Sequence, residues 1–521
     1  MYKIFIDKSN KLTLKFSKKI LGITLLSIVF IYTYFQSVKL EMNKVLPHVA
    51  MQTIASMGAA ISDLEYDLEG YRYYQDVVDS IKFNLIVTNS VGDMILSETE
   101  QNLKNSILID ERIGSSVELK IANLRDGWIG TWPGDIGYTS YVKFSFLLFG
   151  YSISSLHSFY FILLFTSITI TLITFFKRDD VIYFLLILLC GHFVVLLVAH
   201  SEGMQLQTVF NQRFLPVLSC IASFYIVLLI LMNKPFSFIT IIGCIIQSGI
   251  MFLMIHSRSS ALHSVIYIIF ISLVLLFYNI ATFKGIKVFG ISGLKKFAIW
   301  PLSIVIVVYI GLKIHLFLDL NNNRFSKHPI WHQIIMGLSV HPKSVEKYSI
   351  EASDIMPVKL FEKRLIEKYG DDDWRMTGET SSWSAMEKVL KDEFFMILYN
   401  DPIFIIQSYL YKPFLFIKTY FSKSYGIGDG LIHWIVIFSL TIGSIASSGN
   451  FLLLCNRYLF IAISAFLFSA IPFMISNPTI PFVISDASFL FTTVLMIIVT
   501  SILLTVIRMV SENDMKIKLW S

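Results

Sequence analysis

Long apolar stretches recur along most of the chain and constrain its fold more than any other feature. Because about 20 predominantly apolar residues are enough to span a bilayer, the sequence contains about ten candidate membrane spans. These stretches lie at 20–37, 142–176, 181–200, 214–232, 237–255, 262–283, 297–317, 430–447, 457–475 and 487–508. We therefore predict an all-α polytopic membrane protein with about 10 to 12 transmembrane helices. The stretch 142–176 is long enough to include an interfacial helix.

The low share of charged residues excludes an ordinary soluble globular protein. Only 15% of the 521 residues are charged and 55% are hydrophobic, whereas soluble domains are roughly one-quarter charged. The cysteines stand in or beside apolar stretches without CxxC spacing, at Cys190, Cys220, Cys244 and Cys455. We expect them to be small packing residues rather than metal ligands or disulfide partners.

Positive charges indicate the direction of the spans. The lysine-rich segment MYKIFIDKSNKLTLKFSKK precedes the first stretch, as in an uncleaved signal anchor with a cytoplasmic N-terminus. Further basic residues then fall on the same side: Lys177, Arg178, Lys234, those of 284–296, Arg457 and those of the C-terminal tail. This bias predicts a multi-pass protein of the cytoplasmic (inner) membrane with both termini in the cytoplasm. The abundance of Lys, Ile, Asn and Phe is compatible with a bacterial source.

The topology divides the chain into membrane and exterior parts. These are a basic segment with a signal-anchor helix (1–37), a first exterior loop (38–140), spans two to seven (141–317), a second exterior segment (318–428), and C-terminal spans with a cytoplasmic tail (429–521). Both exterior segments show helical spacing of apolar residues, so we expect amphipathic helices in each. The stretch PIFIIQSYLYKPFLFIKTYF predicts a helix lying in the membrane interface or a short additional span.

Charged and polar residues gather at the exterior ends of the predicted spans. They are Asp126 and Asp135 before the second span, His200 and Arg213 around the third loop, His256 and Arg258 in the HSRSS turn, and His328 and His332 in HPIWH. Charge next to hydrocarbon usually has a functional reason. Each residue also has a simpler interpretation: an arginine can extend to headgroups or cap carbonyls, and an aspartate next to glycine can form a turn.

This set of groups suits a lipid-linked phosphate and a sugar. Guanidinium groups bind phosphate oxygens bidentately, so we assign lipid-phosphate binding to the arginines and histidines above. Trp128, Trp132, Tyr138 and Trp331 are candidates for sugar or acceptor contact, or for interfacial anchors. His328 and His332 have the i, i+4 spacing of zinc ligands, but Pro329 stands where HExxH has glutamate. We assign no metal ligands, and the sequence leaves the need for a divalent metal open.

The run GDIGYTSYVKFSFLLFGYSISSLHSFYFILLFTSI (134–168) resembles the loop-to-second-span passage of membrane glycosyltransferases of the C superfamily. The resemblance implies a polytopic helical fold, a polyprenyl-phosphate sugar donor, and a catalytic acidic residue in the first exterior loop. It makes Asp126, Asp135 and Glu41 candidates for that residue, and we favour Asp126 as the general base. The first exterior loop lacks a DxD or WWD motif, and GDIGY replaces the usual prolines. Segment HPIWHQIIMGL is also similar to uncharacterised multi-pass members.

The expected function is transfer of a hexose or pentose from polyprenyl phosphate to an envelope glycan, lipid or protein. No nucleotide donor is expected, because neither a P-loop nor a Rossmann fingerprint is present. We expect no nucleic-acid partner. One alternative is an O-antigen ligase or polymerase. The run MIHSRSSALHSVIYIIF resembles the Ser-Arg turn of that group. The other is a lipid or solute transporter, with His192, Gln247 and His263 inside spans lining a cavity.

Overall fold

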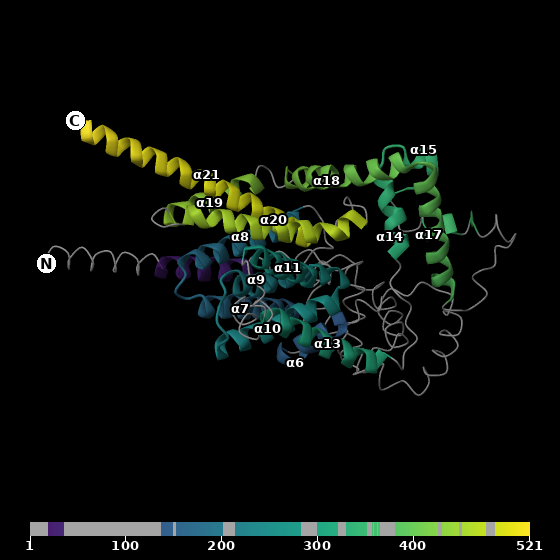
Figure 1. Ribbon diagram of the computed structural model, residues 1–521, viewed down its shortest axis with the longest axis horizontal. Helices are drawn as coiled ribbons and strands as arrows, with labels where there is room; N and C mark the ends of the chain where they lie inside the picture. Colours follow the sequence, from purple (N-terminus) through teal and green to yellow (C-terminus); the bar gives the residue numbers. More distant parts are fainter. Residues whose placement is uncertain are drawn as a thin grey trace, which may run out of the picture.

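The computed structural model describes only helices and the short segments that join them (Figure 1). The described residues are 19–35, 137–149, 153–201, 214–282, 300–320, 330–351, parts of 357–364, 381–425, 430–446, 451–475 and 485–520. No strand occurs within these ranges, so the all-α class predicted from the apolar stretches is confirmed. The amphipathic helices predicted within 45–90 lie outside the described residues.

Helix positions follow the apolar stretches closely. After the helix Lys19–Phe35, the labelled elements are α6 (Gly137–Phe149), α7 (Ile153–Thr174), α8 (Asp179–Ser201), α9 (Pro216–Leu231), α10 (Phe238–Ser257), η2 (Ser259–Leu262), α11 (His263–Thr282), α13 (Trp300–Leu320), α14 (Ile330–Gly337), η4 (Leu338–Val340), α15 (Ser344–Tyr348), α17 (Ser381–Asn400), α18 (Pro402–Tyr425), α19 (Gly430–Ala446), α20 (Phe451–Ile475) and α21 (Ser485–Trp520). The long stretch 142–176 forms two helices, α6 and α7, as its length indicated.

Five helices in the described part of the chain are long and apolar enough to cross a membrane. These segments are Ser155–Thr174, Asp179–Leu196, Phe238–Ser257, Ser260–Phe277 and Asp486–Val506. Shorter apolar helices accompany them, including Lys19–Phe35, Pro216–Leu231 and Arg457–Pro472. The protein is therefore a membrane protein, and a total of about ten spans remains a prediction.

Helices α8 and α9 form the centre of the bundle. In the α8 segment Asp179–Leu196, 94% of the residues are buried, and α9 is buried from Pro216 to Ile230. A helix that is apolar on every side is expected in a protein interior rather than at its surface. Helix α9 packs against α10, α7 and α11, while α21 packs against α8, α19 and α20 (Figure 1). Exposed aliphatic and aromatic side chains cover the outside of α7, α10 and α11, as lipid contact requires.

A small residue allows α9 and α10 to approach closely. The ring of Tyr225 on α9 lies directly over Gly243 on α10, so that a Cβ at this glycine would overlap with the phenol. The Tyr225 hydroxyl donates to the carbonyl of Thr240 at 3.4 Å. Nearby, Gln247 of α10 and Ser167 of α7 share two hydrogen bonds of 2.8 and 2.9 Å. Polar side chains between these helices are thus paired with one another, as membrane burial demands.

The bundle has two ends with different chemistry. We call one the basic end, where Lys19 bonds the Phe176 carbonyl, Lys234 bonds the Thr174 carbonyl at the end of α7, and Arg178 pairs with Asp180 of α8. The far end holds the turn between α10 and α11 and the beginning of α21. In Figure 1 the helix Lys19–Phe35 begins, and α21 ends, on the side of the basic end.

A separate helical unit covers part of the far end. It consists of α14, η4, α15, α17 and α18 around a core that includes Ile335, Phe361, Leu390 and Phe404 (Figure 1). The Glu387 carboxylate on α17 accepts hydrogen bonds from the first backbone N–H groups of α14, at 2.8 to 3.1 Å. This arrangement caps a helix N-terminus with a negative charge. The helix predicted from the stretch 402–421 is therefore present as α18, and α14 begins within HPIWH.

Lys412 fastens this unit to the bundle. Its ammonium on α18 donates to the carbonyl of Ile475 at the end of α20, at 3.3 Å. About two turns further along α18, the Tyr420 hydroxyl forms a hydrogen bond with the Thr492 hydroxyl of α21 at 2.6 Å. The second half of α18 therefore packs alongside the bundle, while its first half belongs to the separate unit.

Candidate functional site

Most of the residues assigned from the sequence lie outside the described residues. These are Glu41, Asp126, Trp128, Trp132, Asp135, Arg213 and His328. His200 stands near the end of α8, where only the backbone is described. Their roles, including that of Asp126 as general base, stay predictions. The described candidates are Tyr138, His256, Arg258, Trp331 and His332.

Three of the described candidates are packed into the protein. Tyr138 is 3% exposed and its ring stacks on Tyr141 with centroids 6.1 Å apart. Trp331 lies against Phe394 of α17 at 5.5 Å. His332 is buried on α14, and its backbone N–H bonds Glu387. Sugar contact by Tyr138 therefore requires that its buried ring become accessible, whereas Trp331 is only partly buried.

Arg258 and His256 occupy the turn at the far end of the bundle. Arg258 ends α10 with an extended backbone, φ −152° and ψ 110°, and its N–H donates to the Met254 carbonyl. Its own carbonyl accepts from Ala261, which begins the short η2 helix. This chain reversal leaves the guanidinium half-buried at the helix end. His256 lies one turn back, stacked on Phe252 at 5.9 Å.

Three buried donor groups from distant parts of the chain meet beside this turn. Cys220 comes from the first turns of α9, His263 begins α11, and Asp486 begins α21. The side chains of His263 and Asp486 are only 4% and 5% exposed. One donor atom from each residue lies within 4.8 Å of the others. Such a set of sulfur, nitrogen and oxygen donors can bind a transition metal or share a proton.

The imidazole of His263 connects the three groups. Its Nδ1 lies 2.8 Å from the Ser260 carbonyl, and a carbonyl can only accept, so Nδ1 carries the hydrogen. Nε2 faces the Cys220 thiol at 3.4 Å. Asp486 Oδ2 lies 3.4 Å from Nδ1 but has no hydrogen-bond donor among the described residues. Arg258 is close enough to Asp486 to attract its charge.

Sequence reasoning did not identify this cluster. Cys220 was expected to be a packing residue, His263 was noted only as a polar residue inside a span, and Asp486 was not singled out. Burial of Cys220 as a free thiol agrees with the absence of a disulfide. The usable signal was an aspartate at the beginning of the apolar stretch DASFLFTTVLMII, because a charge at the edge of a span is costly.

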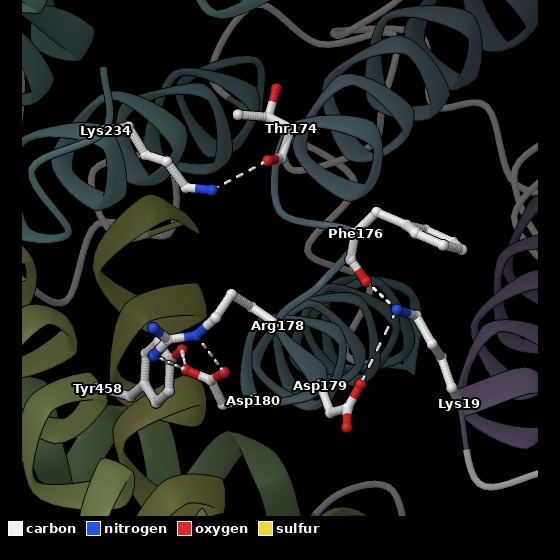
Figure 2. Close-up of polar contacts among 8 residues, drawn as sticks. All are labelled: Lys19, Thr174, Phe176, Arg178, Asp179, Asp180, Lys234 and Tyr458. Atoms are coloured by element: carbon white, nitrogen blue, oxygen red, sulfur yellow. Dashed lines mark hydrogen bonds and ion pairs between the residues drawn. The ribbon is translucent and has the colours of Figure 1, made fainter. Parts of the chain in front are cut away.

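The basic end holds a second polar cluster, shown in Figure 2. Arg178 and Asp180 form a two-pronged ion pair with bonds of 2.9 and 3.0 Å, and the Tyr458 hydroxyl donates to the same carboxylate at 2.6 Å. The hydrogen bond with Asp180 raises the pKa of Arg178. Lys19 bonds the Phe176 carbonyl and lies 4.0 Å from Asp179. These groups join the helix Lys19–Phe35, α8 and α20 at one end.

A surface pocket of about 460 Å³ lies in the separate helical unit. Its lining includes Lys347, Lys359, Lys363, Arg364 and Glu393. Arg364 is engaged with Glu393 through bonds of 2.7 and 2.8 Å. Lys347 is paired with Asp401 at 2.6 Å, and Glu351 also lines the pocket. The described lining is therefore of mixed charge and holds no enclosed donor set.

No family model, curated protein or solved structure matches this chain. Its chemistry must be inferred from its own residues.

Proposed function

We propose that the protein is a membrane glycosyltransferase that moves a sugar from a polyprenyl-phosphate donor to a cell-envelope acceptor. The observation that carries the proposal is the position of Arg258, half-buried at the far end of an apolar bundle. Next to it lie the buried His263 and Asp486. Polar groups of this kind at one level of a membrane bundle are expensive and are retained for function.

Arg258 suits the phosphate of the donor. A guanidinium presents several N–H donors in a fixed plane and binds phosphate oxygens in pairs. At the end of a membrane helix it lies where a lipid phosphate meets the hydrocarbon of its own chain. Its interaction with phosphate is stronger there than in bulk water, because the surroundings have a low dielectric constant.

The proposed reaction is a single inverting displacement. A carboxylate, for which Asp126 is the first candidate and Asp135 and Glu41 the others, removes the proton from an acceptor hydroxyl. The oxygen then attacks the anomeric carbon while the bond between that carbon and the phosphate oxygen breaks. The electron pair leaves with the polyprenyl phosphate, whose added charge Arg258 stabilises. The envelope acceptor is a glycan, a lipid or a protein.

The proposed topology puts the far end outside the cytoplasmic membrane. Lys19, Arg178 and Lys234 at the basic end support a cytoplasmic position for that end, because positive charge is retained inside. With about ten spans, both chain termini then lie in the cytoplasm, and segments 38–140 and 318–428 lie outside.

A ligase or polymerase of envelope glycans is a second candidate. It is favoured by one specific observation, that Arg258 of the Ser-Arg turn lies beside a buried acid, Asp486. Such an enzyme also uses a polyprenyl carrier, but it transfers a preassembled oligosaccharide from a diphosphate. The two functions therefore differ in the donor rather than in the site.

Supply of defined donors to membranes tests the proposal. Membranes containing the protein are incubated with radiolabelled polyprenyl-monophosphate sugars, or with polyprenyl-diphosphate oligosaccharides, and the label in envelope acceptors is measured. We expect transfer from the monophosphate donor, and its loss in Asp126→Asn at unchanged expression. Transfer only from the diphosphate donor would establish the second candidate. Label transfer from neither donor would overturn both.

A further inference from the structure

We propose that Cys220, His263 and Asp486 form a binding site for a divalent transition-metal ion, zinc above all. His263 and Asp486 also lie next to Arg258 in the proposed glycosyltransferase site, but metal binding by this cluster does not depend on glycosyl transfer. Thiolate, imidazole and carboxylate are the three protein ligand types that Zn²⁺ takes. They come from α9, α11 and α21, so an ion bound here would also join three helices of the bundle.

The distances fit a tetrahedral ion. Zinc lies about 2.3 Å from a cysteine sulfur and about 2.0 Å from a histidine nitrogen, which places these two ligands roughly 3.5 Å apart at a tetrahedral angle. Cys220 Sγ and His263 Nε2 are 3.4 Å apart. One donor atom from each of the three residues lies within 4.8 Å of the others, and Asp486 Oδ2 is 3.4 Å from His263 Nδ1.

The orientation of His263 is that of a metal ligand. Histidines that bind a metal through one nitrogen usually donate the other N–H to a carbonyl or carboxylate, which fixes the ring. Here Nδ1–H is directed at the Ser260 carbonyl at 2.8 Å. Nε2 is consequently the nitrogen with a free lone pair, and it is the one that faces Cys220.

One oxygen of the Asp486 carboxylate, Oδ2, lacks a hydrogen-bond donor among the described residues, and a cation would satisfy it. The other oxygen, Oδ1, accepts from the Ala487 N–H at 3.0 Å. The residue is 3% exposed. His263 is 3.4 Å away, but its hydrogen is directed at Ser260. An unsatisfied buried carboxylate is costly. A divalent ion would neutralise this carboxylate and a Cys220 thiolate together.

Three protein ligands leave one position of a tetrahedral ion open. Structural zinc sites generally have four protein ligands, whereas catalytic sites have three and hold water or substrate in the fourth position. Ser264 Oγ lies 3.5 Å from Nε2, so a hydroxyl is also present near the proposed ligands. The proposed ion is therefore able to accept an oxygen ligand at the same end of the bundle as Arg258.

Metal analysis of the full-length protein tests this site. The protein is purified in detergent without metal-affinity chromatography, and its zinc content is measured by mass spectrometry after dialysis against a zinc buffer. We expect one zinc ion per chain in the wild type. Cys220→Ser and Asp486→Asn should weaken zinc binding by at least about 10-fold, the lower range for changes around a metal. Cys190→Ser, which changes a buried free cysteine on α8 outside the donor group, should retain it.

A second measurement tests the site on the wild type alone, so that it does not depend on the folding of a variant. Cobalt in place of zinc should produce a sulfur-to-metal absorption band, and a chelator should abolish this band and lower the melting temperature. Equal zinc content in Cys220→Ser and Cys190→Ser, or a wild type that binds neither metal, would overturn the site. Zinc binding without sugar transfer would overturn only the proposed function.

Discussion

The two ends of the bundle both contain a buried aspartate at the beginning of a helix, but the two carboxylates differ in their hydrogen-bond donors. At the basic end, Asp180 accepts hydrogen bonds from Arg178 and from Tyr458 (Figure 2). At the far end, Asp486 has one oxygen without a donor among the described residues. Buried charge is tolerated when it is paired and costly when it is not. The first carboxylate therefore serves the fold, and the second is poised for a ligand.

The partners at the basic end come from neighbouring turns and neighbouring helices. Arg178 is two residues from Asp180, and Tyr458 lies within the first half of α20, its ring stacked on Phe184 at 4.5 Å. Lys234 also contributes, since its ammonium bonds the Thr174 carbonyl, and burial lowers its pKa, with Arg178 and Lys177 acting in the same direction. The hydrogen bonds and the ion pair at this end hold the helices together.

The largest expected effect is on activity at the far end. Arg258→Ala should lower sugar transfer by roughly 10²–10³-fold, the range for loss of one group that stabilises developing charge. Arg457→Ala removes an exposed arginine at the other end of the bundle and should leave transfer unchanged. Transfer rates in membranes with matched protein levels measure both. Equal rates in the two variants would remove Arg258 from the reaction.

The next effect is on stability at the basic end. Asp180→Ala leaves the buried Tyr458 hydroxyl without its acceptor and should lower the free energy of unfolding by about 2–3 kcal/mol. The control is Asp179→Ala, which removes only a 4.0 Å contact with Lys19 and should cost less than about 1 kcal/mol. Thermal unfolding in detergent compares the two. Similar losses from both would contradict a structural role specific to Asp180.

A milder change at the same cluster is Tyr458→Phe. It removes the 2.6 Å hydrogen bond to Asp180 but keeps the ring, and Arg178 still satisfies the carboxylate. We expect a loss of about 1 kcal/mol in the free energy of unfolding. A loss as large as that of Asp180→Ala in the same unfolding assay would mean that the phenol, rather than the arginine, holds this end together.

The smallest expected effect is that of Asp486→Asn on the chelator-treated protein. Asn keeps an oxygen for the Ala487 N–H, which Asp486 accepts at 3.0 Å, and it removes a buried charge that lacks a donor. The free energy of unfolding should change by no more than about 1 kcal/mol. Without chelator, the wild type should be the more stable of the two, because a ligand that binds only the folded state stabilises it. A large loss in chelator would make Asp486 a structural residue like Asp180.

The fold was largely predictable and the far-end cluster was not. Each apolar stretch contains a helix, because a membrane span can be recognised from its number of consecutive apolar residues. Arg258 and His256 were recognised as candidates, since both stand in one short turn. Asp126, Asp135 and Glu41 lie in segments that are not described, and their roles rest on the sequence.

The sequence by itself determined the all-helical class, the membrane character, the approximate ends of the helices, and the concentration of lysine and arginine at one end. These properties depend on neighbouring residues and on hydrophobic length. Only the tertiary structure brought Cys220, His263 and Asp486 together, since they come from α9, α11 and α21. Their meeting depends on which helix faces pack against each other. Local periodicity cannot encode that choice, because nearly every face of these central helices is apolar.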